Sequence, residues 1–137
     1  GVNGESRVKL ERQIEDRGLT GEVTLTGFVD NAERNALYKY SRAFLFPSVF
    51  EGFGMPPIEA MLFGTVVITT KRTCIPEVTQ GKANYVADPY DMQEWICAMQ
   101  KPVDRIDEMD FSMYDQKRLT RQYFRLLSET LGSKERM

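Results

Sequence analysis

Glu51 and Glu59 stand with seven residues between them in a stretch of glycine, proline and large apolar residues. Gly52 and Gly54 can bring bare backbone close to a ligand. The two prolines that follow have no N–H to donate, so the free amides are those of residues 52–55, and amides just ahead of a helix suit an anion such as a diphosphate. A carboxylate suits neutral hydroxyls, such as a ribose diol, because it accepts two hydrogen bonds. Diphosphate and diol together describe a nucleotide.

A second interpretation of the same residues needs no ligand. Glu59 in the first turn of a helix would stabilise the helix dipole by roughly 0.3–1 kcal/mol, Glu51 would be a solvated loop residue, and the glycines would only turn the chain. The apolar side chains of the loop favour a site, because loops avoid large apolar residues unless these line a pocket or pack on the core. These side chains are Phe50, Phe53 and Met55.

The candidate site lies where a strand, a loop and a helix meet. Ala43–Phe46 is a continuous apolar run, as in a strand buried on both faces. The prolines at 56 and 57 suit the first turn of a helix that reaches Phe63, and residues 65–70 form the next predicted strand. Ligands bind at the carboxyl ends of parallel strands, and residues 47–54 fall at such an end.

The rest of the chain continues the alternation of strands and helices, which predicts an α/β fold with a three-layer parallel sheet. Asp30 with Glu33 three residues on is typical of a capping box. We expect two helices to bury apolar stripes, namely Met92, Trp95, Ile96 and Met99 in a helix that starts at Asp88–Pro89, and Leu119, Tyr123, Leu126 and Leu127 in a last helix at about 113–131. The other expected elements are helices at 5–18 and 30–40 and strands at 23–26 and 84–86.

Composition limits the class of protein. The 137 residues suffice for one domain, and a net charge of -2 argues against a nucleic-acid partner. Histidine is absent, so the chain offers no histidine base or metal ligand. Cys74 and Cys97 form no C-x-x-C pair, as in a protein of the reducing cytoplasm. No apolar run is long enough to cross a bilayer. The chain begins without Met, which suggests a piece of a longer protein.

Three runs together closely resemble the donor-binding half of the family 4 retaining glycosyltransferases, which have the GT-B fold. They are Phe46-Pro-Ser48, Glu51-Gly-Phe-Gly-Met-Pro-Pro-Ile-Glu59-Ala-Met and Gly64-Thr-Val-Val-Ile68. The resemblance covers roughly residues 1–100 and includes Val23–Val29, Leu37–Tyr38, Ile75–Val78 and Asp88–Pro89.

The resemblance implies a role for each part of the site. Glu51 would be the catalytic residue that lies against the transferred sugar, and Glu59 would hold the ribose hydroxyls. The backbone around Gly52, Phe53, Gly54 and Met55 would bind the donor sugar or diphosphate. Residues near the nucleobase would be Phe28, Val29 and Asn31. Such enzymes need no cofactor and no metal at the site, and their substrate is a UDP-, GDP- or ADP-sugar.

The resemblance also places the chain in a larger enzyme. Residues 1–137 would form one partial nucleotide-sugar-binding domain, the C-terminal half of a GT-B glycosyltransferase without its first strands, with a final helix at 111–131. The parent would transfer a hexose to a glycan or lipid acceptor in polysaccharide biosynthesis, in the cytoplasm or at the inner face of the membrane. We expect the acceptor domain, and an Arg and a Lys for the diphosphate, to lie upstream, so that this chain alone is inactive.

Other partners and functions follow from the same reasoning. Missing strands would leave a sheet edge uncovered, which favours self-association or a rearranged N-terminus, and the parent would associate peripherally with a membrane. The alternatives to a transferase are a non-catalytic module that binds a sugar nucleotide and another GT-B enzyme, such as a nucleotide-sugar epimerase or a phosphorylase. Product identity separates the enzymes from each other.

Overall fold

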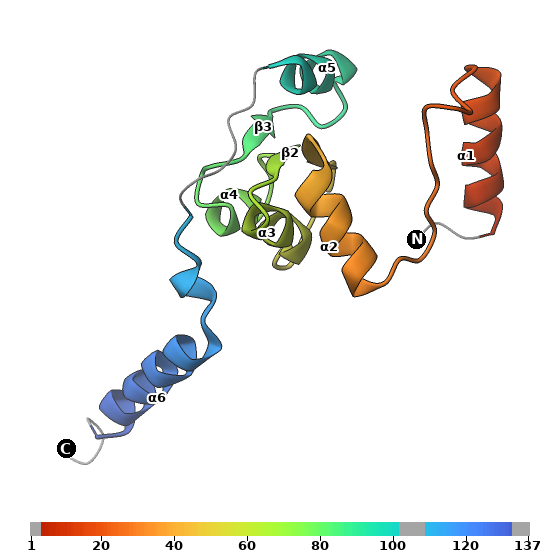
Figure 1. The fold of residues 1–137 in the computed structure, drawn as a ribbon. Helices are drawn as coiled ribbons and strands as arrows, with labels where there is room; N and C mark the ends of the chain where they lie inside the picture. The colour runs from red at the N-terminus through yellow and green to blue at the C-terminus, as the bar shows by residue number, and fades with distance from the viewer. Residues whose placement is uncertain (1–3, 102–108, 133–137) are drawn as a thin grey trace.

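The computed structural model describes residues 4–101 and 109–132 of the chain, drawn in Figure 1. Short strands alternate with helices in its middle part. In chain order the elements are α1 (Glu5–Asp16), α2 (Asn31–Tyr40), β1 (Ala43–Phe46), α3 (Met55–Leu62), β2 (Val66–Thr70), α4 (Ile75–Val78), β3 (Asn84–Val86), α5 (Met92–Gln100), the 3-10 helix η1 (Phe111–Tyr114) and α6 (Gln116–Gly132).

The three strands form one parallel sheet in the order β1-β2-β3. The central strand, β2, is buried at every position, which fits a sequence that is β-branched throughout and shows no alternation. Val67 on one face packs with Tyr38 of α2 and Met61 of α3, whereas Ile68 on the other face packs with Trp95 of α5. Helices therefore cover both faces of the sheet, and the predicted three-layer α/β fold is confirmed.

The capping box predicted at Asp30 is confirmed. The Asp30 carboxylate accepts a hydrogen bond from the Glu33 N–H at 2.8 Å, and the Glu33 carboxylate accepts one from the Asp30 N–H at 2.9 Å. These contacts satisfy two of the N–H groups that a helix start leaves unpaired. They fix where α2 begins and hence how α2 meets α3.

The strand predicted at 23–26 is wrong, because these residues belong to neither a helix nor a strand. They contact α1 instead of the sheet: Arg7 donates to the Leu25 carbonyl at 3.5 Å, and Val23 and Leu25 line a small hollow against α1. In Figure 1, α1 stands apart from the sheet. An apolar, β-branched segment becomes a strand only when a neighbouring strand pairs with it. On the described chain the outer edge of β1 lacks such a neighbour, and Leu45 is 41% exposed.

The predicted start and stripe of the helix after Asp88–Pro89 need correction. α5 begins at Met92, because the carboxylate of Asp91 caps it by accepting from the Gln93 N–H at 2.8 Å. Trp95 is buried as expected, and its indole N–H donates to the Pro89 carbonyl at 3.0 Å. Met92 and Met99 are exposed, because the face of α5 that meets the sheet is centred on Trp95 and Ala98.

The last helix also differs from the prediction. It is two elements, because Asp115 ends η1 and its carboxylate accepts from the Lys117 N–H at 2.8 Å at the start of α6. The burial predicted for its apolar stripe is wrong for the side chains that the structure describes, since Leu119, Tyr123 and Leu126 are exposed. α6 leads away from the sheet in Figure 1 and offers them no core to join. Leu127 lies outside the described side chains.

One short helix was not predicted. α4 occupies Ile75–Val78, a segment to which neither a helix nor a strand was assigned from the sequence. Proline suits a first turn, and Ile75 and Val78 are buried. The burial of these two side chains beside the start of α3 explains why the segment forms a helical turn.

Candidate functional site

The loop that carries Glu51 is anchored to the central strand. Two buried threonines at the carboxyl end of β2 donate their hydroxyls to carbonyls at the start of the loop: Thr69 to Phe46 at 2.8 Å and Thr70 to Ser48 at 2.6 Å. The carboxyl ends of β1 and β2 therefore meet, as parallel strands require, and the loop leaves from that edge.

Glu51 itself is held by its backbone. Its N–H donates to the Thr73 hydroxyl at 3.3 Å, and its carbonyl accepts from the Cys74 thiol at 3.4 Å. Thr73 has a positive φ of 48°, a conformation that few non-glycine residues adopt and that marks a constrained turn. The loops after β1 and β2 thus form one unit, which leaves the Glu51 carboxylate available at its surface.

The backbone between the two carboxylates offers free donors. Within the described residues, no hydrogen bond is donated by the N–H of Gly52, Phe53 or Gly54. Gly54 is the residue before α3, with φ of 80° and ψ of 51°, a left-handed conformation that suits glycine. It lies against α4, since a Cβ there would be 3.7 Å from Val78 Cγ2. Free amides ahead of a helix N-terminus form an arrangement that can receive an anion.

Glu59 lies in the second turn of α3, not in the first as predicted, because the helix begins at Met55. Its side chain meets α2. Arg34 Nε approaches Glu59 Oε2 at 3.5 Å, and the Tyr38 hydroxyl donates to the same oxygen at 3.5 Å. Arg34 Nε is buried and this approach lacks hydrogen-bond geometry. Both contacts use Oε2, so Oε1 is the oxygen that remains for a ligand.

Arg34 and Tyr38 are the partners that sequence reasoning missed. They stand four residues apart, so they project from the same face of α2. The sequence did contain a signal for them: an arginine and a tyrosine one turn apart on a helix that must pack beside the helix carrying Glu59. Together they hold the Glu59 carboxylate from the α2 side.

The pKa of Tyr38 is raised above its ordinary value, first by burial and then by the negative charge of Glu59, while Arg34 opposes the rise. The folded state therefore keeps this proton to higher pH than the unfolded chain does. The resulting stability is present below about pH 10 and is lost as the pH rises through the raised pKa.

We expect Glu59→Gln to lower the pKa of Tyr38, because it removes the negative charge beside the hydroxyl. Ultraviolet titration of tyrosinate in wild type and variant measures this change, and Tyr38→Phe identifies the signal of Tyr38. Tyr114, whose pKa is raised mainly by its own burial, is the internal reference and should not move. An unchanged Tyr38 titration would mean that Glu59 does not lie beside the hydroxyl in solution.

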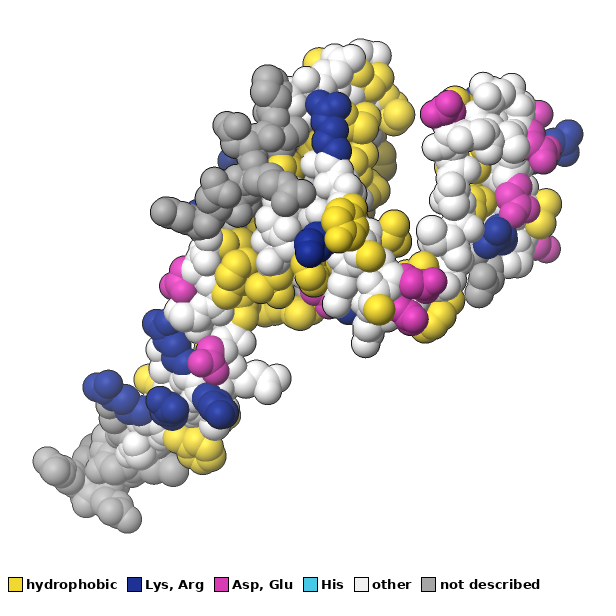
Figure 2. Space-filling view, in the orientation of Figure 1, with side chains coloured by type: hydrophobic (Ala, Val, Ile, Leu, Met, Phe, Trp, Pro, Cys, Tyr) yellow, Lys and Arg dark blue, Asp and Glu magenta, His cyan; other side chains and the backbone are white. Residues whose placement is uncertain are grey.

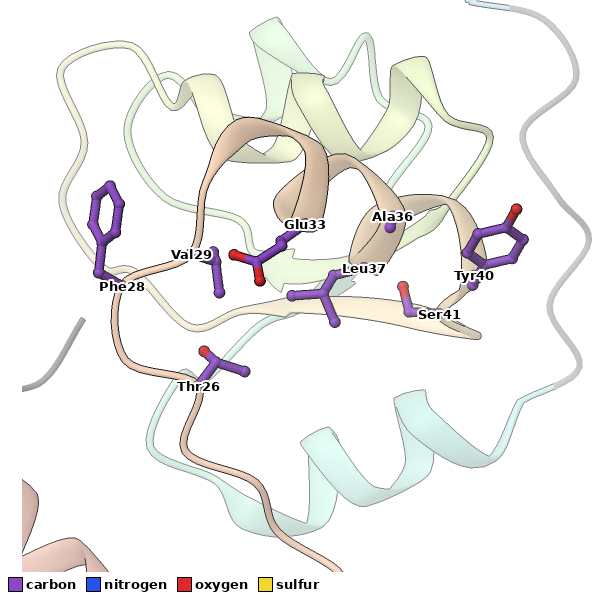
Figure 3. A pocket seen from close by; sticks show the side chains of 8 residues that line it. All are labelled: Thr26, Phe28, Val29, Glu33, Ala36, Leu37, Tyr40 and Ser41. Carbon is purple, nitrogen blue, oxygen red and sulfur yellow. The ribbon is translucent and has the colours of Figure 1, made fainter.

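A second hollow, shown in Figure 3, lies at two of the three residues predicted near the nucleobase. Phe28 and Val29 line it, and Asn31 is the first residue of α2. The hollow has a volume of about 700 Å³ and opens between the segment 26–29 and one side of α2. Phe28 is 90% exposed, so its ring is available to stack on a planar ligand.

The apolar residues of the loop do not share one environment. Phe53 and Met55 line a cavity of about 590 Å³ that α3 and α4 share with η1 and the start of α6. The Phe53 ring meets Tyr114 edge to face, with centroids 6.2 Å apart. Phe50 is 80% exposed. Phe53 and Met55 therefore border a hollow, as apolar loop residues at a site should, whereas Phe50 does not line it.

Two further facts concern the described part of the chain. It contains no group of three or more His, Cys, Asp or Glu side chains that could hold a metal ion. None of its helices combines the length and the apolar character needed to span a bilayer.

The arrangement can bind an extended ligand with distinct groups. Glu51 is fixed from the side of residues 73–74, and Glu59 is fixed from α2, so the two carboxylates are held by different neighbours. Free amides lie between them in sequence. This arrangement suits a molecule with hydroxyls at two places and an anion between them.

Comparison with known proteins gives a consistent result. The family model described as glycosyl transferases group 1 matches residues 1–110. Serotype-specific mannosyltransferase WbdA of Escherichia coli is 36% identical over 101 residues, which are 73% of this chain and 12% of that protein. O-antigen chain mannosyltransferase B of Escherichia coli is 41% identical over 81 residues, which are 58% of this chain and 21% of that protein.

A third relative is O-antigen chain mannosyltransferase RfbU of Salmonella typhimurium, 37% identical over 92 residues, which are 67% of this chain and 26% of that protein. The chain thus corresponds to about a quarter or less of the length of these three relatives. No solved structure matches the chain significantly.

Proposed function

The chain belongs to the glycosyl transferases group 1 family, and on that premise we propose that it is the donor-binding part of a retaining glycosyltransferase. The family implies a nucleotide-sugar donor and an acceptor. One observation carries the proposal for this chain: the backbone N–H groups of residues 52–54 donate no hydrogen bond within the described structure. In sequence they lie between two glutamates, Glu51 and Glu59, which are held by different neighbours.

We assign each part of the site, the two glutamates and the amides between them, to one part of the donor. Glu59 accepts hydrogen bonds from the ribose hydroxyls through Oε1, while Arg34 and Tyr38 hold Oε2. The amides from Gly52 to Met55 face the diphosphate and stabilise the charge that develops as it leaves, which is electrostatic catalysis. Glu51 positions the transferred sugar at its reacting face. No metal or other cofactor is needed in this scheme, because backbone donors and basic groups do the work.

The nucleobase lies beside Phe28, Val29 and Asn31, at the hollow in Figure 3. The transferred sugar is mannose, because three relatives with good identity are mannosyltransferases by name. The acceptor is a growing glycan, on the same ground that two of them act on an O-antigen chain by name. The parent works in the cytoplasm or at the inner face of the membrane, where nucleotide sugars are available.

A calorimetric comparison on this chain tests the donor site. We expect one of UDP, GDP and ADP to bind, and its mannose derivative to bind more tightly. Glu51→Gln should reduce only the extra affinity of the mannose derivative, by roughly threefold to tenfold, which is the worth of one or two hydrogen bonds to the sugar. Glu22→Gln, which changes an exposed carboxylate in the N-terminal segment, is the matched control.

Two results would contradict the donor site. Binding of none of the three nucleotides would remove it altogether. If Glu51→Gln lowered the affinity for the nucleotide and for its mannose derivative by the same factor, Glu51 would contact the nucleotide instead of the sugar.

The reaction class is tested on the full-length parent by product identity. A mannoside with retained configuration supports transfer. An epimerised nucleotide sugar or a sugar phosphate would assign the parent to a different GT-B reaction, and tight donor binding without turnover would make it a binding module.

A further inference from the structure

A single side chain, that of Phe53, lies within the segment that carries the free amides. Glu51 before this segment is held by residues 73–74, and α3 begins after it at Met55. A Cβ at Gly52 would meet no atom within 4 Å, so the chain is open there. Glycine has more backbone freedom to lose than any other residue. Phe53 stands between two glycines and is therefore the residue whose side chain can fix this backbone.

The Phe53 ring packs against Tyr114 of η1. The two rings meet edge to face with their planes at 85°, a geometry that aromatic pairs favour. Both residues line the cavity of about 590 Å³ described above, and Figure 2 shows apolar side chains gathered on the body next to the segment that leads into α6. Phe53 is still 49% exposed. Its contact with Tyr114 therefore matters for where the ring lies.

Tyr114 belongs to an element that is attached to both α4 and the core. Its hydroxyl donates to the carbonyl of Val78 at the end of α4. The Gln80 side chain pairs with both backbone groups of Asp110, since its Nε2 donates to the carbonyl at 2.7 Å and its Oε1 accepts from the N–H at 3.3 Å. Phe111 packs against the core cluster. η1 can thus serve as a fixed support for the loop.

The end of α4 contacts the loop and η1 together. The Val78 side chain lies against Gly54, while its backbone carbonyl accepts from Tyr114. Gln80, two residues after Val78, has a φ of 52°, which few non-glycine residues adopt. Its N–H donates to the Glu77 carbonyl at 2.9 Å and closes the turn. One constrained turn therefore holds both partners of the aromatic contact.

We propose that Tyr114 is a positioning residue for the donor, because it holds Phe53 and thereby fixes the amides of residues 52–54 where the diphosphate binds. The inference rests on the donor site proposed above. Donors that are already in place cost no reorganisation when the ligand binds or when charge develops on it. Tyr114 lies after residue 110, where the match to the family model ends, so the match says nothing about it.

NMR titration of the 15N-labelled 137-residue chain tests the effect on binding. Tyr114→Leu removes the ring contact but keeps an apolar side chain at the cavity. It should weaken binding of the nucleoside diphosphate, whichever of UDP, GDP and ADP binds wild type, about tenfold, because the ligand must then order about one residue of backbone. Affinity for the corresponding nucleoside should not change. Tyr123→Leu, the same substitution at an exposed position of α6, should bind both ligands as wild type does.

Relaxation of the same amides without ligand tests the contact itself. The heteronuclear NOE of residues 52–54 should fall in Tyr114→Leu, because these amides become more mobile on the picosecond to nanosecond timescale. Tyr114→Phe keeps the ring contact and loses only the hydroxyl bond to Val78, so its values should stay closer to those of wild type. Tyr123→Leu should leave them unchanged.

Three results would overturn the role of Tyr114. They are unchanged NOE values in Tyr114→Leu, equal effects of the Leu and Phe variants, and an equal loss of affinity for the nucleoside and its diphosphate, which would indicate a general loss of structure. Failure of the donor site looks different, because wild type would then bind none of the three nucleotides. The NOE values would still decide whether Tyr114 fixes residues 52–54.

Discussion

Glu59→Gln is expected to weaken binding of the nucleoside diphosphate about a hundredfold. The carboxylate can accept hydrogen bonds from both ribose hydroxyls, and hydrogen bonds to a charged group contribute about 1.5–3 kcal/mol. The change keeps the volume of the side chain. It also leaves Arg34 beside a neutral amide, so the side chain at position 59 is less firmly held by α2 and carries no charge. Isothermal calorimetry on the 137-residue chain measures the affinity.

Two comparisons make this result specific to the ribose. The 2′-deoxy nucleotide should bind wild type more weakly than the ribonucleotide, and Glu59→Gln should largely abolish that difference. Glu22→Gln, which changes an exposed carboxylate in the N-terminal segment, should bind as wild type does. Unchanged affinity in Glu59→Gln would refute the ribose role, and a lowered melting temperature with retained discrimination would show that the effect is structural.

Ile68→Ala is expected to cost about 2–5 kcal/mol of the free energy of unfolding. Ile68 is fully buried at the centre of the middle strand, where it packs with Val86 and Trp95. Truncation leaves a cavity that helices on both faces prevent from closing. The sheet has three short strands, so a loss of this size is a large share of the stability of an ordinary domain. Denaturation followed by Trp95 fluorescence measures the loss.

Leu45→Ala is the matched control for Ile68→Ala. Leu45 pairs with Ile68 in the register of β1 and β2 and is 41% exposed. A comparable loss of volume there should cost well under half as much, because less apolar surface leaves the protein interior. Equal costs for the two variants would show that the edge of β1 is covered in solution.

The sequence predicted best where local and long-range preferences agree. Ala43–Phe46 is an uninterrupted apolar run and every residue of 65–70 is β-branched, which favours strands without alternation of apolar and polar residues. The burial on both faces expected for Ala43–Phe46 holds only in part, because Leu45 is 41% exposed at the edge of the sheet. Asp30 and Glu33 satisfy each other locally, so the start of α2 needed no tertiary information. The loop between β1 and α3 followed from the same elements, because the chain must turn at the carboxyl edge.

The failures concern elements whose state depends on a neighbour. The segment 23–26 has strand-like residues but contacts α1 instead of β1. α6 has the apolar stripe of a buried helix, but periodicity describes amphipathicity and does not say which surface will cover it. Arg34 was missed because an ion pair between two helices depends on how the helices pack. The spacing of Arg34 and Tyr38 places them on one face of α2, but it does not say that this face meets Glu59.

The hydroxyls of Thr69 and Thr70 hold carbonyl oxygens of Phe46 and Ser48, not side chains. Every amino acid supplies a carbonyl, so substitutions along the loop leave this attachment intact. Substitutions at residues 50–53 can therefore alter which ligand the loop accepts without breaking the hydrogen bonds that attach the loop to β2. Among related proteins, these two hydrogen bonds can stay constant while the preference for the sugar diverges. Selection on the fold acts on the two threonines, whereas selection on the substrate acts on the loop residues.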